Sequence, residues 1–155
     1  MTADPWTGTT PQSLRDLALP PGCRLLLLGP HPDDFDAIGV TLRLLHDRGH
    51  PLHAGVAMSG SGVEDSYRPG LDLSGKARLR VEEQRRSIRL FGLPENALTL
   101  LDLENAADDQ MLDTPANQAQ LAKLITTVSP LVVFLPHGQD TNPAHRAMYA
   151  MVRRS

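Results

Sequence analysis

The sequence predicts an α/β fold of the Rossmann-like, three-layer kind, in which helices cover both faces of a mostly parallel sheet. Short apolar runs, such as residues 25–29 and 131–135, alternate along the chain with segments whose apolar residues recur at helical spacing. Strands that alternate with helices form parallel sheets with right-handed crossovers. Each of these two runs is followed directly by a loop rich in His and Asp. Because such loops meet at the carboxyl edge of a parallel sheet, the sequence also predicts a polar site there.

The chain begins with a segment that is expected to lie outside the main domain. Residues 1–22 contain four prolines and are predicted to form an irregular leader with one helical turn at 12–18. The domain itself is expected at 23–155. Its first strand is expected at 24–29 and is apolar throughout after Arg24, which is typical of a central strand that is covered on both faces.

The next elements are a helix, a strand and a long connection. Apolar residues at helical spacing predict a helix at 35–48, and Gly49 is a natural C-terminal stop. A strand is predicted at 52–58, followed by a Gly/Ser loop at 59–62. The segment 63–75 is polar and has no clear period, so it is expected to be a loop.

The second half repeats the alternation. A helix is predicted at 76–91, where glutamates precede arginines at spacings that suit a solvated helix face. A short strand at 97–101 and an acidic loop at 104–114 follow. The helix predicted at 115–128 begins with a proline, which fits a first helical turn. The last helix is expected to start near residue 143.

Composition limits the classes of function. The chain of 155 residues has the size of one domain, and its net charge of −3 and pI of about 6.0 argue against nucleic acid or an anionic membrane as partner. The single cysteine, Cys23, excludes an internal disulfide and a cysteine-based zinc site. No apolar stretch is long enough to span a bilayer, and residues 1–21 lack the pattern of a secretory signal. A cytoplasmic enzyme is therefore expected.

The polar loops contain candidate metal ligands. His31 and Asp34 offer an imidazole nitrogen and a carboxylate oxygen, and a catalytic zinc keeps three protein ligands and a water. The best third ligand is His145, in the first turn of the last helix. Such a metal would lower the pKa of its water to about 7. Asp33 is next to a ligand but expected to point to a different side, so it is the predicted general base.

Other residues are candidates for the oxyanion and the substrate. Asn142, His137 and Arg146 are within sequence reach as oxyanion donors, and one such donor typically lowers the barrier by about 2.7–4 kcal/mol. Arg68 and Arg80 are predicted to contact an anionic or hydroxyl-rich substrate, although exposed arginines usually face solvent.

Simpler interpretations exist for each motif. The tetrapeptide at 31–34 could be a turn that caps a helix, since Asp is a preferred N-cap residue. His145 taken alone could be a surface histidine. The Gly-Ser-Gly segment at 60–62 could cradle a phosphate, but it lacks the spacing of a nucleotide fingerprint and no Lys-Ser/Thr follows. The loop at 63–75 and the acidic residues 108–109 are expected to rim the pocket.

Two motifs carry a resemblance to a known family. Residues 27–34, Leu-Leu-Gly-Pro-His-Pro-Asp-Asp, resemble the first motif of the zinc-dependent de-N-acetylases, the PIG-L type, which include GlcNAc-PI de-N-acetylases and LmbE-like proteins. Asn142-Pro143-Ala144-His145 is similar to the family's second motif, His-Pro-Asp-His. Arg80 and Glu83 match an Arg-x-x-Glu pair on the helix after the second strand. The order of elements agrees over residues 24–150.

The resemblance implies a site and a reaction. It makes His31, Asp34 and His145 the metal ligands and Asp33 the base. The implied reaction is hydrolysis of an N-acetyl group, commonly on a glucosamine, with release of acetate and an amine. The implied cofactor is Zn²⁺, although a His/Asp/His set also accepts iron, manganese or cobalt. The implied partner is a small N-acetylated molecule, such as a glycoside.

Three positions depart from the family pattern. Phe35 replaces the usual Glu after the paired aspartates, so an apolar side chain is expected to pack there. Asn142 replaces the first His of the second motif, and Ala144 replaces its Asp. Our hypothesis is that Asn142 is a neutral oxyanion donor, with His137 or Asp33 giving the proton to the leaving amine.

The length of the chain suggests alternatives. Family members usually continue well past the second motif, so the chain is expected to be a C-terminally truncated fragment. Its unpaired edge strand could then associate with a second copy as a homo-oligomer. A metal-binding or ligand-binding module that has lost catalysis is the alternative function. A nucleotide-binding domain is a third reading that rests on fold class and on Gly60 and Gly62.

Overall fold

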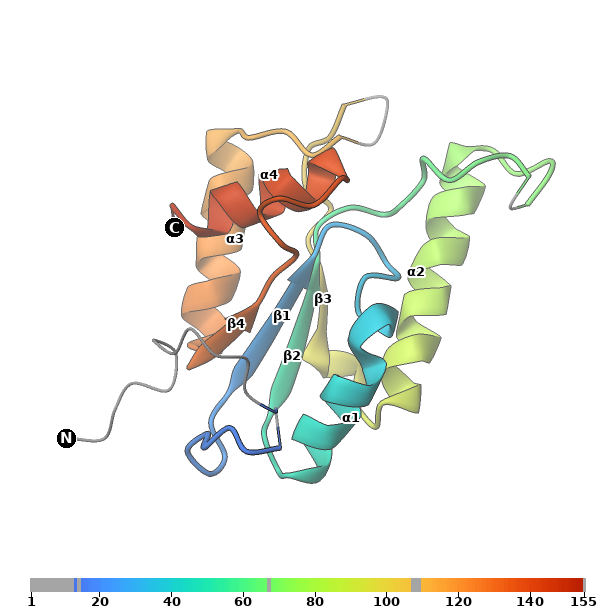
Figure 1. The fold of residues 1–155 in the computed structure, drawn as a ribbon. Coiled ribbons are helices and arrows are strands. Elements are labelled where there is room, and N and C mark those ends of the chain that lie inside the picture. The colour runs from blue at the N-terminus through green and yellow to red at the C-terminus, as the bar shows by residue number, and fades with distance from the viewer. Residues whose placement is uncertain (1–12, 14, 67, 107–109, 155) are drawn as a thin grey trace.

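The computed structural model describes residues 13, 15–66, 68–106 and 110–154, and its strands form one parallel sheet (Figure 1). The strands are β1 (Leu25–Gly29), β2 (Leu52–Val56), β3 (Leu98–Leu100) and β4 (Val132–Phe134). Their order across the sheet is β3-β2-β1-β4, and every pairing is parallel. The predicted fold class is confirmed. Most of the predicted leader lies outside the described residues.

Helices cover both faces of the sheet (Figure 1). They are η1 (Asp36–Ile38), α1 (Gly39–Asp47), α2 (Leu73–Leu90), η2 (Glu95–Ala97), α3 (Pro115–Val128) and α4 (Pro143–Val152). One hydrophobic cluster joins β1 to α1 and α2, and a second joins β1 to α3 and α4, so the domain has three layers. Among the described residues, none of the helices has the length and apolarity needed to cross a bilayer.

The central strand β1 is buried on both faces, which accounts for its uninterrupted apolar sequence. Leu25 and Leu27 pack into the cluster with α1 and α2, whereas Leu26 and Leu28 pack into the cluster with α3 and α4. Each of these leucines is at most 2% exposed. Side chains alternate between the faces of a strand, and both faces are covered here. Burying each leucine contributes about 1.5–3 kcal/mol, so these side chains add substantially to the stability of the core.

Local capping fixes the ends of two helices. α3 spans the predicted residues. Its start is fixed by Thr114, whose hydroxyl accepts a hydrogen bond from the Asn117 amide at 3.2 Å, and by Pro115, which begins the first turn. α2 begins three residues earlier than predicted. The carboxylate of Asp72 accepts from the Gly75 amide at 2.7 Å and caps the helix at that point.

The helix predicted at 35–48 begins later than expected. Asp36–Ile38 is a short 3-10 turn, and the α-helix starts only at Gly39. Phe35 is 3% exposed and packs into the cluster with α1, as the apolar side chain predicted at that position. Gly49 follows the helix with a φ of +80°, a conformation that favours glycine, which agrees with its predicted role as the stop.

The strand order places a switch point between β1 and β4. The chain runs outward from β1 through β2 to β3, and then α3 returns it to the other side of β1 as β4. The loops after β1 and β4 therefore leave the same edge of the sheet next to each other. In open α/β sheets, ligands bind at this point.

Two buried side-chain amides differ in their hydrogen bonding. Asn117 is fully buried, and its side chain makes hydrogen bonds of 2.7–2.9 Å to the backbone of Glu104 and Leu112, which holds the acidic loop onto α3. Gln84, on α2, is also fully buried. Within the described residues, neither its amide nitrogen nor its amide oxygen has a hydrogen-bond partner. A buried polar group without a partner costs about 1–3 kcal/mol.

Gln84→Met is expected to raise the free energy of unfolding by about 1 kcal/mol, because it keeps the shape of the side chain and removes the unsatisfied amide. Urea unfolding measures this change. Asn117→Leu is the matched control and is expected to lower the unfolding free energy by at least about 2 kcal/mol, since it leaves several backbone groups unpaired. A Gln84→Met variant that is less stable than the wild type by about 1 kcal/mol or more would contradict this account.

Candidate metal centre

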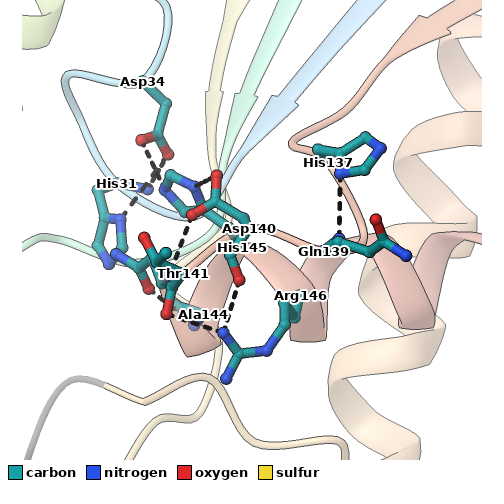
Figure 2. Close-up of polar contacts among 10 residues, drawn as sticks. His31, Asp34, His137, Gln139, Asp140, Thr141, Ala144, His145 and Arg146 are labelled. Atoms are coloured by element: carbon teal, nitrogen blue, oxygen red, sulfur yellow. Dashed lines mark hydrogen bonds and ion pairs between the residues drawn. The ribbon is translucent and has the colours of Figure 1, made fainter.

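Three potential metal ligands converge at the switch point. His31 and Asp34 lie in the loop after β1, and His145 lies in the first turn of α4. One ligand atom from each residue lies within 4.8 Å of the other two. Figure 2 shows the three side chains turned toward one another. They are the same three residues that the sequence analysis predicted as metal ligands.

The loop after β1 folds Asp34 back toward His31. The Oδ2 atom of Asp34 accepts a hydrogen bond from the backbone amide of His31 at 2.8 Å. Gly29 makes this turn sterically feasible, because a Cβ atom there would lie 2.8 Å from both Cβ and Oδ2 of Asp34. The turn leaves Oδ1 of Asp34 directed at His145, whose Nε2 lies 3.1 Å away.

The start of α4 sets the position of His145. Asn142 is the N-cap residue, and its side-chain oxygen accepts from the Ala144 amide at 2.9 Å. Pro143 begins the first turn. Ala144 is 3% exposed and packs in the core, which leaves His145 to face the loop after β1. The predicted start of this helix agrees with the structure.

Asp140 contacts His145 from the other side. Its Oδ2 lies 3.0 Å from Nδ1 of His145, and its Oδ1 accepts from the Asn142 amide at 2.8 Å. The hydrogen bond from Asn142, and then the one from His145, hold the pKa of the Asp140 carboxyl below its usual range. The imidazole of His145 is therefore placed between two carboxylates, those of Asp34 and Asp140.

Asp33 and Asp34 have different partners although they are adjacent. Asp33 forms an ion pair with Arg80 of α2, with 2.8 Å between Oδ1 and Nη2. The Arg80 side chain is only 10% exposed and also pairs with Glu83 at 3.1 Å, whereas the Asp33 side chain is 58% exposed. Asp34 instead pairs with His31 and His145. The two carboxylates thus face different sides of the loop, as the sequence analysis expected.

The cluster lies in a cavity of about 1090 Å³. Asp33, Arg80 and Asn142 line the same cavity as the candidate ligands. Ile38, Phe134 and Leu135 contribute an apolar part of the wall. The cavity therefore joins a charged region to an apolar one, as small-molecule sites commonly do.

The loop before α2 forms another part of the wall. Gly60, Gly62 and Val63 line the cavity. Lys76 is buried, and its ammonium donates to the Val63 carbonyl and pairs with Asp65, both at 2.7 Å. Of the described residues in the predicted rim segment 63–75, Val63 alone lines the cavity, and Gly60 and Gly62 belong to the preceding Gly/Ser loop. The predicted rim residues 108–109 lie outside the described residues.

Two predicted substrate contacts lie away from this cavity. His137 is exposed, and its Nδ1 accepts from the Gln139 amide at 3.2 Å (Figure 2). Arg68 is exposed in a turn. Neither side chain is part of the cavity wall. Arg80, in contrast, lines the cavity, and the roles of all three as substrate contacts stay predictions.

Asp140 is the site residue that the sequence analysis missed. It belongs to the His- and Asp-rich loop after β4, and the sequence analysis assigns it no role. The available signal was an acidic residue a few positions before a candidate histidine ligand, and such carboxylates often hold the second ring nitrogen of a metal-binding histidine. The loop geometry shows that the Asp140 carboxylate reaches Nδ1 of His145.

The donor set fits a divalent cation. Two imidazoles and one carboxylate are the ligands that catalytic zinc sites use, with a position left for water. The side chains of His31, Asp34 and His145 are 19%, 15% and 20% exposed, so they are shielded but open to the cavity. The residues present therefore fit a metal centre at this point.

Gly29→Ala is expected to lower the affinity for zinc by about 10-fold or more, because the new methyl group displaces Asp34. Competition with a chromogenic chelator measures the affinity. Gly55→Ala is the control: its Cβ would lie 2.7 Å from Leu124 and Leu28 in the core. It should reduce stability by about 1–3 kcal/mol and leave zinc affinity unchanged. Equal affinity in Gly29→Ala and the wild type would refute the steric role of Gly29.

Comparison with solved structures supports the fold. The N,N'-diacetylchitobiose deacetylase from Pyrococcus horikoshii, solved with its inhibitor MPG, matches with a TM-score of 0.72 and 24% identity over 84% of this chain and 48% of that protein. The conserved protein TT1542 from Thermus thermophilus matches with a TM-score of 0.61 and 24% identity over 84% of this chain and 54% of that protein. The chain thus spans about half the length of these two structures. No curated protein sequence matches it.

A family comparison covers most of the sequence. The sequence model described as PIG-L, GlcNAc-PI de-N-acetylase, matches residues 26–155. This stretch runs from β1 through α4 and contains all three residues of the cluster. The chain belongs to the GlcNAc-PI de-N-acetylase (PIG-L) family.

Proposed function

We propose that this chain carries the catalytic centre of a zinc-dependent hydrolase that removes an N-acetyl group from an amino-sugar substrate. The observation that carries the proposal is the convergence of His31, Asp34 and His145 in one cavity with Asp33. Membership of a de-N-acetylase family supports the choice of an amide as the bond that is cleaved. The products are acetate and a free amine.

The cation is proposed as Zn²⁺, held by His31, Asp34 and His145. A divalent cation bound there supplies a Lewis acid that polarises the amide carbonyl and makes water a better nucleophile at neutral pH. The same donor set also accepts Fe²⁺ and related metals, so the metal in the cell depends on availability as well as on geometry.

Asp33 is proposed as the general base. Its carboxylate lines the cavity but is not one of the three clustered donors, so it can accept a proton from the attacking water. The ion pair with the buried Arg80 holds the carboxylate in place. As the water oxygen bonds to the carbonyl carbon, its proton passes to Asp33. When the carbon–nitrogen bond breaks, Asp33 returns that proton to the leaving nitrogen.

Asn142 is proposed as the neutral donor to the oxyanion. Its side-chain oxygen is engaged with the Ala144 amide, so its NH₂ group is the part that can donate into the cavity. An amide cannot carry a positive charge or deliver a proton. Because His137 does not line the cavity, Asp33 is the better of the two proton donors that the sequence suggested.

The substrate is proposed to be a small N-acetylated glycoside. The family description names GlcNAc-PI, and the solved relative from P. horikoshii is named for N,N'-diacetylchitobiose. Both names share an N-acetylglucosamine unit. The cavity of about 1090 Å³ has room for a sugar with part of its aglycone.

Cytoplasmic location and homo-oligomerisation stay predictions.

The alternative is a module that binds a metal or ligand without catalysis. The replacement of the family's His and Asp by Asn142 and Ala144 favours it. The retained Asp33, paired and open to the cavity, favours the enzyme. The nucleotide-binding reading has less support: Gly60 approaches Pro32 so closely that a Cβ atom would lie 2.9 Å from Cδ, which accounts for this glycine without a phosphate.

Asp33→Asn is expected to lower turnover by about 10²–10⁴-fold while zinc stays bound, because the variant loses the base but keeps every ligand. Release of acetate from N-acetylglucosamine and N,N'-diacetylchitobiose measures turnover, and elemental analysis measures zinc. Asp36→Asn, at the start of η1 and not part of the cavity wall, is the control and should retain turnover. A zinc-loaded wild type without any turnover would favour the binding module, and full activity in Asp33→Asn would exclude Asp33 as the base.

Asn142→Asp and Asn142→Ala are expected to reduce kcat by about 10²–10³-fold, since both lose the NH₂ donor to the oxyanion. Aspartate can still cap α4, so its stability should be close to that of the wild type, whereas alanine should cost about 1 kcal/mol of unfolding free energy. Steady-state kinetics and urea unfolding separate the two effects. Wild-type kcat in Asn142→Asp would mean that Asn142 acts only as the helix cap.

A further inference from the structure

We infer that Asp140 is a positioning residue that fixes the ring orientation and tautomer of His145. The inference rests on the proposed metal centre and goes beyond it, because Asp140 is not one of the three candidate ligands. It concerns which nitrogen of His145 is presented to the cation. Asp140 acts through His145 and has no direct role in the chemistry.

The two oxygens of Asp140 have separate partners. Oδ2 lies 3.0 Å from Nδ1 of His145, and Oδ1 accepts from the Asn142 amide at 2.8 Å. An ionised carboxylate can only accept hydrogen bonds, so a hydrogen on Nδ1 of His145 satisfies Asp140, and Nε2 is left for the cation that His145 would share with Asp34. In a neutral imidazole, the lone pair is then on Nε2. Nε2 is the atom that faces Asp34, at 3.1 Å.

The backbone around Asp140 is held in place. Arg146, from the turn of α4 that also holds His145, donates to the carbonyls of Asp140 and Thr141 at 2.7 and 2.8 Å (Figure 2). The amide of Asp140 donates to the His137 carbonyl at 3.0 Å. The carboxylate is therefore placed before any cation arrives, and little reorganisation is needed when His145 binds one.

A purely structural role for Asp140 makes a different prediction. If the residue only stabilised the loop through the Asn142 amide, an asparagine could replace it. In Asp140→Asn, the side-chain oxygen can still accept from that amide, but the NH₂ group then faces Nδ1 of His145. This arrangement favours the tautomer with hydrogen on Nε2, which cannot bind a cation at that nitrogen. This single substitution therefore distinguishes a structural role of Asp140 from a role in metal binding.

The test compares zinc affinity, by chelator competition, in the wild type, Asp140→Asn and Thr141→Ala. Asp140→Asn is expected to bind zinc about 10–100-fold more weakly, while the urea unfolding midpoint of the metal-free protein is unchanged. With Co²⁺, the visible absorption bands of this variant should shift or weaken, because the ligand set is altered. Thr141→Ala changes a neighbouring residue of the same loop and should retain wild-type affinity and the wild-type Co²⁺ spectrum.

Three outcomes decide the inference. Wild-type affinity and an unchanged Co²⁺ spectrum in Asp140→Asn overturn it and leave the proposed function intact. A folded wild type that binds neither metal overturns the proposed function and this inference with it. Should Asp140→Asn fail to fold, Arg146→Ala decides: it loosens the Asp140 backbone but keeps the carboxylate, so a several-fold loss of zinc affinity is expected, and wild-type affinity overturns the inference.

Discussion

The parallel pairing of β1 with β4 is the constraint on which the site depends. Leu25 pairs with Val132 and Leu27 with Phe134, so both strands end at the same edge of the sheet. This register brings Asp34 next to His145, although 111 positions separate them in the sequence. A slip by one residue would exchange the side chains of β4 between the two faces of the sheet and break the packing of both hydrophobic clusters. The burial of apolar side chains on the two faces of β1 therefore helps to hold the site together.

The loop after β1 directs two adjacent carboxylates toward different partners. Asp34 turns back toward His31 and His145, whereas Asp33 turns toward Arg80 on α2. The division needs a glycine at the end of β1 and a short 3-10 turn before α1. Since the two aspartates face different partners, one can hold a cation while the other stays available for proton transfer. Under the proposed function, the same tetrapeptide would supply both a metal ligand and a general base.

Much of this arrangement could be predicted from the sequence, because it depends on patterns that are local. The apolar run of β1 and the Thr114-Pro115 start of α3 are signals of burial and capping that need no tertiary information. The three clustered residues could be predicted because each follows a strand-like run. The late start of α1 could not, since it depends on how Phe35 packs. The role of Asp140, and the distance of His137 and Arg68 from the cavity, depend on the paths of loops, which periodicity does not encode.

The large sequence separation between Asp34 and His145 also affects the order in which the protein assembles. Contacts between distant segments cost more loop-closure entropy and tend to form late. A folding chain in which β1, β2 and β3 have paired but β4 has not docked holds only the His31 and Asp34 donors, so it should bind cations weakly. A cation that prefers the complete site acts on the last step of folding and stabilises the docked β4 and α4, by about 2.7 kcal/mol at a free concentration about 100 times its Kd. Metal supply in the cell would then influence how much of the chain reaches and keeps its native state.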